Sequence, residues 1–416
     1  LMYTMRLCLK SFFLFFLLSC QSSEENRELD FNTTHSDSII DNSGEEVAVQ
    51  ISVGAEKINE ILELIEGNSV AIVANQTSRV GSTHLVDTLI ALKVDVKAVF
   101  SPEHGFRGDA DAGEKVNSKK DQKTGLPLFS LYGSNRKPTK DQLEGIDVVI
   151  FDVQDVGARF YTYISTLHYV MEACAESNKK VVILDRPNPN GQSVDGPIRK
   201  SGYESFVGMH PVPIIHGMTI GEYGKMINGE KWLKNEVVCD LEVVTCDNYT
   251  HDSTYSLPIA PSPNLRSDQS IALYPSLCLF EGTIMSVGRG TETPFEVFGH
   301  PDLDKYPDKY NFEFTPKPSY GAKHPKLEDK KCFGKDLSEI NIENGKLHLE
   351  WLIESYNDVD RNDFFITKNG WFDLLAGTNE LRKQIEKGLS ESEIRASWQD
   401  ELDQFRSTRA KYLIYD

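Results

Sequence analysis

The sequence lacks the basic character of a nucleic-acid-binding protein. Its 416 residues carry 63 acidic and 44 basic side chains, which gives a formal net charge of −19 at pH 7. Because phosphate backbones are polyanions held by Lys and Arg, so acidic a chain without a long basic cluster excludes nucleic acid as a partner. The composition, 26% charged and 39% hydrophobic, is otherwise globular. At about 150 residues per domain, the length predicts two or three domains and excludes a disordered or fibrous protein.

The sequence also lacks an apolar run long enough to cross a membrane. The run at residues 12–18 follows Arg6 and Lys10 and ends just before a cysteine. A spanning helix needs about 20 apolar residues, so the run is too short for that purpose. A short basic segment followed by a short apolar run predicts a signal peptide over residues 1–19.

The end of that run, Leu17-Leu18-Ser19-Cys20, is similar to a bacterial lipobox. Cleavage of such a signal leaves the cysteine to carry acyl chains, and several chains make a stable membrane anchor. We therefore expect a lipid on Cys20, followed by a disordered tether over residues 20–50 that is rich in Ser, Asn, Asp and Glu. The expected location is the bacterial cell envelope, with the anchor in the outer membrane and the protein facing the periplasm. The alternative is an ordinary secretory signal with an incidental cysteine.

Cysteine is sparse, and no CxxC occurs. The cysteines beyond the predicted lipidation site are Cys174, Cys239, Cys246, Cys278 and Cys332. Their odd number and wide spacing exclude a dense disulfide framework and a cysteine metal site. They are predicted to be buried free thiols, with a Cys239–Cys246 disulfide as the open alternative. HxH and HExxH are absent too, so we expect no metal and no cofactor.

Motifs for several enzyme classes are missing. No GxGxxG follows the first predicted strand, and GxxxxGK[ST] and GxSxG occur nowhere. The first two absences argue against dinucleotide and P-loop chemistry, because those Gly-rich turns cradle phosphates. The third removes support for a serine hydrolase.

What is present is an alternation of strands and helices. β-Branched apolar runs at 70–74, 96–100, 148–151 and 181–184 alternate with helical spacing at 84–92 and 161–177. Such runs predict buried parallel strands in βαβ units. We therefore predict an α/β fold, with a Rossmann-like parallel-sheet domain over residues 51–265. Beyond a loop-rich part at 211–221 and a change of composition, residues 266–416 are predicted to form a smaller α+β domain, with amphipathic segments at 347–356 and 381–405.

Polar side chains follow the four predicted strands. In strand order they are Asn75 and Gln76; Glu103 and His104; Asp152, Gln154, Asp155 and Arg159; and Asp185, Arg186 and Asn188. Ligands of open α/β sheets bind at the carboxyl ends of the strands, and this mixture of carboxylates, amides and guanidinium groups suits a sugar. Later loops add His216, Asn264, Arg289 and Glu292. For each residue alone, a turn or a helix cap is the competing interpretation.

Glu103 is the best candidate for a catalytic group. It follows a buried strand and a proline, and a partly buried carboxyl at such a place suits a general acid that protonates a glycosidic oxygen. We favour Asp155 as a second carboxylate, leaving Asp109, Asp111, Glu114, Glu292 and Glu296 open, so a retaining, an inverting and a substrate-assisted course all remain possible. His104 is expected to support Glu103. Arg107, Arg159 and Arg289 are candidates to bind a substrate carboxylate, since guanidinium binds carboxylates bidentately.

Five segments together carry a family resemblance. They lie at 101–108 (SPEHGFRG), 111–114 (DAGE), 152–163 (DVQDVGARFYTY), 185–189 (DRPNP) and 288–291 (GRGT). In this order they closely resemble the NamZ-type exo-β-N-acetylmuramidases, once catalogued as a domain of unknown function, and the resemblance runs from about residue 67 to the end. Asn190 departs from it, because Leu is common in the family at that position.

The resemblance implies a Rossmann-like domain and a smaller C-terminal domain with the active site in the cleft between them. It implies release of N-acetylmuramic acid from the non-reducing end of peptidoglycan fragments, with Glu103 as the principal catalytic carboxylate. The lactyl carboxylate of muramic acid would give Arg159 or Arg289 a purpose. The alternative is a non-catalytic envelope lipoprotein that captures muropeptides or other glycans in the same cleft.

Overall fold

The computed structural model describes residues 38–40, 46–48, 50–103, 105–107, 119–342 and 345–416. The predicted signal peptide, Cys20, His104, Asp109, Asp111 and Glu114 lie outside these residues. Within the segment predicted as a tether, β1 (Ser38–Ile40) and β2 (Glu46–Ala48) pair antiparallel. Over the described ranges, no helix combines the length and the apolar character that a membrane crossing requires.

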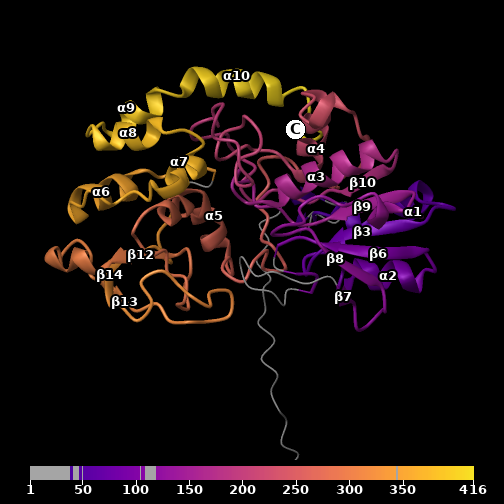
Figure 1. The fold of residues 1–416 in the computed structure, drawn as a ribbon, viewed down its shortest axis with the longest axis horizontal. Helices are drawn as coiled ribbons and strands as arrows, with labels where there is room; N and C mark the ends of the chain where they lie inside the picture. Colours follow the sequence, from indigo (N-terminus) through magenta and orange to yellow (C-terminus); the bar gives the residue numbers. More distant parts are fainter. Residues whose placement is uncertain (1–37, 41–45, 49, 104, 108–118, 343–344) are drawn as a thin grey trace, which may run out of the picture. The chain divides into compact units, whose positions relative to one another are not determined.

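The central element is a seven-stranded sheet with the strand order β11-β10-β9-β3-β6-β8-β7 (Figure 1). Its strands are β3 (Val70–Ala74), β6 (Val96–Ser101), β7 (Lys119–Lys120), β8 (Pro127–Ser130), β9 (Val148–Asp152), β10 (Lys180–Leu184) and β11 (Asp240–Val244). Neighbours are parallel except for β7 beside β8. The chain runs outward from β3 to β8, then returns to the other side of β3 and continues to β11. This is the strand order of a Rossmann fold, which confirms the predicted fold class.

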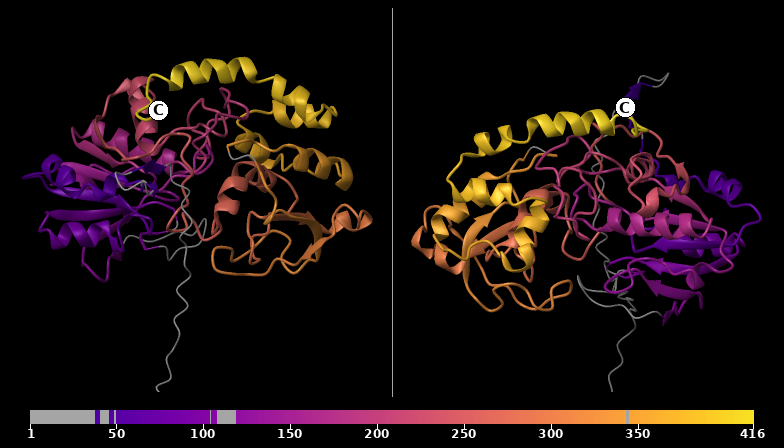
Figure 2. Two further views of the ribbon diagram at one scale, coloured as in Figure 1. Left: turned by 180° about the vertical axis from the view of Figure 1, so that it is seen from behind. Right: turned by 45° about the horizontal axis from the view of Figure 1, so that its top comes forward.

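Helices cover both faces of the sheet, because successive side chains of a strand point to opposite faces. In β3, Val70 and Ile72 pack in a core with α1 (Ile58–Leu64) and α2 (Leu85–Ala91). Ala71 and Val73 pack in the other core, with α3 (Tyr163–Glu176) and α4 (Ile220–Gly229). Figure 2 shows these layers from two further directions, with the early strands in indigo and magenta. Burial on both faces explains why the strands read as continuous apolar runs.

Side-chain caps set where two of these helices begin. His84 lies in the short hairpin of β4 (Arg79–Val80) and β5 (Thr83–His84), and its Nδ1 accepts a 3.2 Å hydrogen bond from the Val86 N–H at the start of α2. Thr219 forms a capping box with Glu222: the Thr219 hydroxyl accepts from the Glu222 N–H at 3.2 Å, and the Thr219 N–H donates to the Glu222 carboxylate at 2.9 Å. The sequence predicted α2 and α3 but not α4, because Pro and Gly just before it indicated only a loop.

The C-terminal part of the chain has a small antiparallel sheet and a set of helices. The sheet has the order β12-β14-β13, formed by β12 (Val297–His300), β13 (Phe312–Phe314) and β14 (Cys332–Asp336). The helices are α5 (Asp268–Leu277), α6 (Glu350–Val359), α7 (Trp371–Ala376), α8 (Glu380–Glu386), α9 (Glu391–Ala396) and α10 (Gln399–Arg409). The predicted amphipathic segment at 381–405 is therefore three helices, and Ser390 caps the middle one by accepting from the Glu393 N–H.

The end of the chain returns to the Rossmann-like part. The Tyr415 hydroxyl donates a 2.7 Å hydrogen bond to Asp185 beyond β10, and the Ile414 N–H donates a 2.8 Å bond to Glu222 in α4. The five cysteines of the described residues are buried and free, so Cys239 and Cys246 are not joined by a disulfide.

Candidate active site

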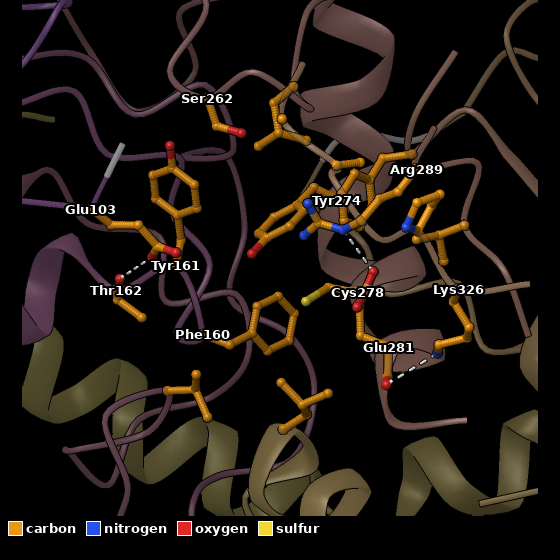
Figure 3. Close-up of a pocket in the computed structure, with 18 of the residues that line it drawn as sticks. Glu103, Phe160, Tyr161, Thr162, Ser262, Tyr274, Cys278, Glu281, Arg289 and Lys326 are labelled. Atoms are coloured by element: carbon orange, nitrogen blue, oxygen red, sulfur yellow. Dashed lines mark hydrogen bonds and ion pairs between the residues drawn. The ribbon is translucent and has the colours of Figure 1, made fainter. Parts of the chain in front are cut away.

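A cavity of about 1050 Å³ is lined by residues from both parts of the chain (Figure 3). One wall comes from the segment after β6, the loop after β8, the residues just before α3 (Tyr163–Glu176) and the loop before residue 208. The other wall comes from α5, the short 3₁₀-helix Cys278–Gly282, the glycine-rich segment after it and the loop between β13 and β14. Among the lining residues are Glu103, Tyr132, Arg136, Phe160, Tyr161, Thr162, Phe206, Tyr274, Glu281, Arg289, Lys326 and Trp371.

Glu103 is fixed by its neighbours on the first wall. The Thr162 hydroxyl donates a 3.1 Å hydrogen bond to Glu103 Oε2, and the Tyr163 hydroxyl donates a 3.4 Å bond to the Glu103 carbonyl oxygen. Tyr132 adjoins the same carboxylate: burial, the charge of Glu103 and a hydrogen bond with it raise the pKa of Tyr132 well above its ordinary value. Because Glu103 follows β6 after a proline that stiffens the chain, its carboxylate is held at the cavity wall.

The opposite wall carries a charged cluster. Arg289 Nε donates to Glu281 Oε1 at 2.9 Å, and the Arg289 guanidinium lies 4.9 Å from the centre of the Phe295 ring. Lys326 Nζ donates to the carbonyl oxygens of Phe280, Glu281 and Thr283. Burial acts to raise the pKa of Glu281, but the charges of Arg289 and Lys326 outweigh it and lower that pKa overall. Glu281 is therefore an ionised carboxylate that is already paired.

Aromatic rings lie between these two walls. In Figure 3, Phe160, Tyr161 and Tyr274 separate Glu103 from Arg289. Tyr274 meets Phe160 and Tyr161 edge to face, with ring centres 5.5 and 5.7 Å apart. A large cavity with aromatic walls and a few fixed polar groups is the usual form of a small-molecule site, and flat apolar rings beside carboxylate and hydroxyl groups suit a sugar.

Arg159 lies outside the cavity wall, although the sequence made it a candidate carboxylate binder. It is fully buried, and its guanidinium donates 2.7–2.9 Å hydrogen bonds to the carbonyl oxygens of Pro197, Val212 and Leu375. Burial lowers the pKa of Arg159 to about 9, so it stays charged at neutral pH. Because the donors point at backbone, this guanidinium holds three chain segments together.

Asp155 and His216 form a second buried pair that does not line the cavity. Asp155 Oδ2 accepts a 2.7 Å hydrogen bond from the Gly157 N–H and lies 3.8 Å from His216 Nε2. Burial raises the pKa of Asp155 to about 7. Burial, with the charges of Arg409 and Arg159, lowers the pKa of His216 to about 3. The structure thus separates Asp155 from Glu103, which does line the cavity.

The other polar residues that the sequence singled out, at the strand ends and at Asn264, bind neighbouring segments and do not line the cavity. Their partners are Tyr163 for Asn75, the carbonyl oxygen of Pro187 for Gln154, Thr219 and Tyr415 for Asp185, Asp152 for Arg186, the carbonyl oxygen of Met218 for Asn188 and that of Gly321 for Asn264. The four strands are neighbours in the sheet, but most of the polar side chains at their ends are bound within the protein. Asn190, where the family often has Leu, donates to the Val156 and Ile271 carbonyl oxygens.

Gln76 and Arg107 line a separate, smaller pocket of about 300 Å³. Arg107 is paired there with Asp121 at 3.0 Å and Asp87 at 3.3 Å, so its charge is matched by two carboxylates. Glu292 is exposed and lines neither pocket. Of the predicted residues that the structure describes, Glu103 and Arg289 are therefore the two that the large cavity brings together.

Sequence reasoning missed several cavity residues. Thr162 and Tyr161 lie within the family-like segment at 152–163, but no chemical pattern distinguished them. Tyr132 and Arg136 lie in a polar loop with no motif at all. No group of three or more His, Cys, Asp or Glu side chains in the described ranges is arranged to hold a metal ion.

Comparisons with known proteins match both parts of the chain. The family model described as exo-beta-N-acetylmuramidase NamZ, N-terminal, matches residues 70–269, and the corresponding C-terminal model matches residues 272–415. The peptidoglycan beta-N-acetylmuramidase NamZ of Bacillus subtilis (strain 168) is 38% identical over 368 residues, covering 84% of this chain and 88% of that protein.

Solved structures show the same architecture. A DUF1343 family protein from Bacteroides fragilis NCTC 9343 is 44% identical, with a TM-score of 0.81 over 88% of this chain and 99% of the other. A second DUF1343 protein of that strain is 28% identical, with a TM-score of 0.75 over 88% of this chain and all of the other. The two family models together span nearly all of the chain after residue 70. The chain therefore belongs to the exo-beta-N-acetylmuramidase NamZ family and is a glycosidase.

Proposed function

We propose that this protein releases N-acetylmuramic acid from the non-reducing end of peptidoglycan fragments, and that Glu103 is its general acid. The main observation in support is that Glu103 lines the large cavity and that its carboxylate accepts a 3.1 Å hydrogen bond from the Thr162 hydroxyl. A general acid must protonate the glycosidic oxygen as the bond to the leaving group breaks. The Bacillus subtilis relative, a peptidoglycan beta-N-acetylmuramidase, supports the substrate class.

Glu281 is the second carboxylate among the described lining residues. Its pairing with Arg289 makes it a poor nucleophile or base, because a strong ion pair reduces the reactivity of the oxygen that it holds. The proposal therefore gives Glu281 the role of positioning the Arg289 side chain. The anomeric configuration of the first product, followed by NMR, reads out whether the course is retaining or inverting.

The test of the proposed function uses a chromogenic N-acetyl-β-muramide and the purified protein. Glu103→Gln should lower kcat by about 10²–10⁴-fold, the usual contribution of general acid catalysis. Glu60→Gln is the matched control, because Glu60 is an exposed carboxylate on α1. Wild-type activity in Glu103→Gln would overturn the assignment of Glu103. Muropeptide binding without any turnover by the wild-type protein would favour a glycan-capturing lipoprotein instead.

We also propose that a lipid on Cys20 anchors the protein in the bacterial envelope, in the outer membrane and facing the periplasm. The support is the lipobox-like Leu17-Leu18-Ser19-Cys20 and the peptidoglycan-directed family. Such an anchor places a muramidase beside its polymer. Cys20→Ala should abolish labelling by a clickable fatty acid and release the protein from the membrane fraction; labelling that persists in this variant would contradict the anchor.

A further inference from the structure

Among the described residues, the lining of the large cavity is more basic than the chain as a whole. Its described lining includes four Lys or Arg side chains, Arg136, Arg289, Lys323 and Lys326, and two carboxylates, Glu103 and Glu281. The chain as a whole has a formal net charge of −19. A positive surplus within an acidic protein attracts an anionic ligand to the cavity.

Arg289 and Lys326 are each held by groups of the protein. Arg289 is paired with Glu281 at 2.9 Å, so the two charges offset each other. Lys326 Nζ donates to three carbonyl oxygens, at 3.1, 3.3 and 2.6 Å, which uses its three N–H donors. A substrate carboxylate would have to compete with these contacts.

Arg136 is arranged differently. Its guanidinium lies 4.2 Å from the centre of the Phe206 ring, and it has no carboxylate partner among the described residues. Phe206 is itself held in place: its carbonyl oxygen accepts a 2.7 Å hydrogen bond from Ser165 on α3, and its ring stacks on Tyr169. An aromatic face supports a guanidinium while leaving its edge donors available.

Arg136 also lies on the same side of the cavity as the proposed acid. The guanidinium of Arg136 lies over the Phe206 ring, and Tyr132 shares a hydrogen bond with Glu103. The ring of Tyr132 contacts Phe206 edge to face, with centres 6.4 Å apart. Tyr132 thus lies between the carboxylate that would protonate the scissile oxygen and the guanidinium on Phe206.

We infer that Arg136 binds the lactyl carboxylate of the muramic acid residue and so sets the preference of the cavity for muramides over glucosaminides. The inference rests on the proposed function. The lactyl group is the part of N-acetylmuramic acid that N-acetylglucosamine lacks, and its carboxylate is the charged group of the sugar. A guanidinium with free edge donors binds such a carboxylate bidentately. Arg136 is a specificity residue that touches substrate away from the bond that breaks.

The test compares two substrates on two proteins. The substrates are a chromogenic N-acetyl-β-muramide and the same compound with its lactyl carboxylate converted to a neutral carboxamide. In the wild-type protein the carboxylate form should have the higher kcat/KM, by about 10- to 100-fold, the range for a charge-assisted hydrogen bond. In Arg136→Met this ratio should fall close to one, through a higher KM for the muramide and with kcat largely kept.

Lys140→Met is the matched control, because Lys140 is an exposed cation outside the cavity and close in the chain. It should keep the wild-type ratio. If Arg136→Met keeps the wild-type ratio of kcat/KM for the two substrates, the inference is overturned and the proposed function still stands. Loss of discrimination in Lys323→Met but not in Arg136→Met would also overturn it. A wild-type protein that cleaves neither substrate would overturn the proposed function itself.

Discussion

The hydroxyl of Thr162 donates a 3.1 Å hydrogen bond to the carboxylate of Glu103 and so links the residue before α3 to the segment after β6 (Figure 3). The two residues are 59 positions apart in the chain. Both line the large cavity. The residue before α3 thereby helps to fix the orientation of the proposed acid, in addition to the loop that carries Glu103.

Thr162→Val removes this donor with little change of shape. Because a hydrogen bond to a charged group contributes about 1.5–3 kcal/mol, kcat for the muramide should fall by roughly 10- to 100-fold while KM stays nearly constant. Thr162→Ser keeps the hydroxyl and should recover most of the activity. Steady-state kinetics of the three proteins checks this; equal activity of the Val variant, or no recovery in the Ser variant, would mean that Thr162 does not position Glu103.

Arg159 offers a second test, this time of stability. It donates to Pro197 and Val212 in the part matched by the N-terminal family model and to Leu375 in the part matched by the C-terminal one. Arg159→Met removes these three hydrogen bonds, and of the three carbonyl oxygens that of Val212 keeps a 3.2 Å bond from the Arg199 N–H. The loss should lower the free energy of unfolding by about 3–5 kcal/mol.

Urea unfolding followed by tryptophan fluorescence measures this loss. Arg361→Met is the control, because Arg361 is an exposed arginine paired only with surface carboxylates, and its unfolding midpoint should stay near the wild-type value. An Arg159→Met midpoint equal to that of the control would show that the three bonds give no net stabilisation.

The predicted strands agree with the structure because each is marked by a continuous apolar run in the sequence. Runs such as Val70–Ala74 are apolar at every position, and the structure buries every one of those side chains. By contrast, β11 (Asp240–Val244) was not predicted, because as an edge strand it keeps alternate residues exposed and so mixes acidic with apolar positions. Local pattern therefore reveals central strands more readily than edge strands.

The site was predicted less completely, and the reason is that hydrogen-bond partners are distant in the chain. Glu103 could be found because it directly follows a strand. The sequence could not show that the guanidinium of Arg159 meets Leu375, 216 positions away, or that Asn75 is bound to Tyr163. Arg136 had no motif around it, and only its stacking on Phe206 reveals it. Residue type suggests chemistry, but the fold decides which polar groups face a ligand.

The buried pair of Asp155 and His216 makes a prediction about pH. Burial raises the pKa of Asp155 from 3.8 to about 7, so the folded carboxyl holds a proton that the unfolded one has lost. Alone, this makes stability fall as pH rises from about 4 to 7. Burial lowers the pKa of His216 from 6.5 to about 3, so the unfolded ring takes up a proton that the folded ring does not. Alone, this makes stability fall as pH drops from about 6.5 to 3.

In the wild-type protein these two effects oppose each other. Between about pH 4 and 6.5 the pair holds one proton when folded, on Asp155, and one when unfolded, on His216, so it adds no net pH dependence. In Asp155→Asn, His216 is the member of the pair that still titrates. Relative to the wild type, the free energy of unfolding of this variant should drop by about 1.4 kcal/mol for each pH unit below 6.5. His216→Asn leaves the carboxyl alone and should show a slope of opposite sign. Urea unfolding of the three proteins at several pH values gives the slopes after subtraction of the wild type. Slopes of the same sign in both variants, or no slope in either, would contradict the expectation that the proton sits on Asp155 in the folded protein and on His216 in the unfolded one.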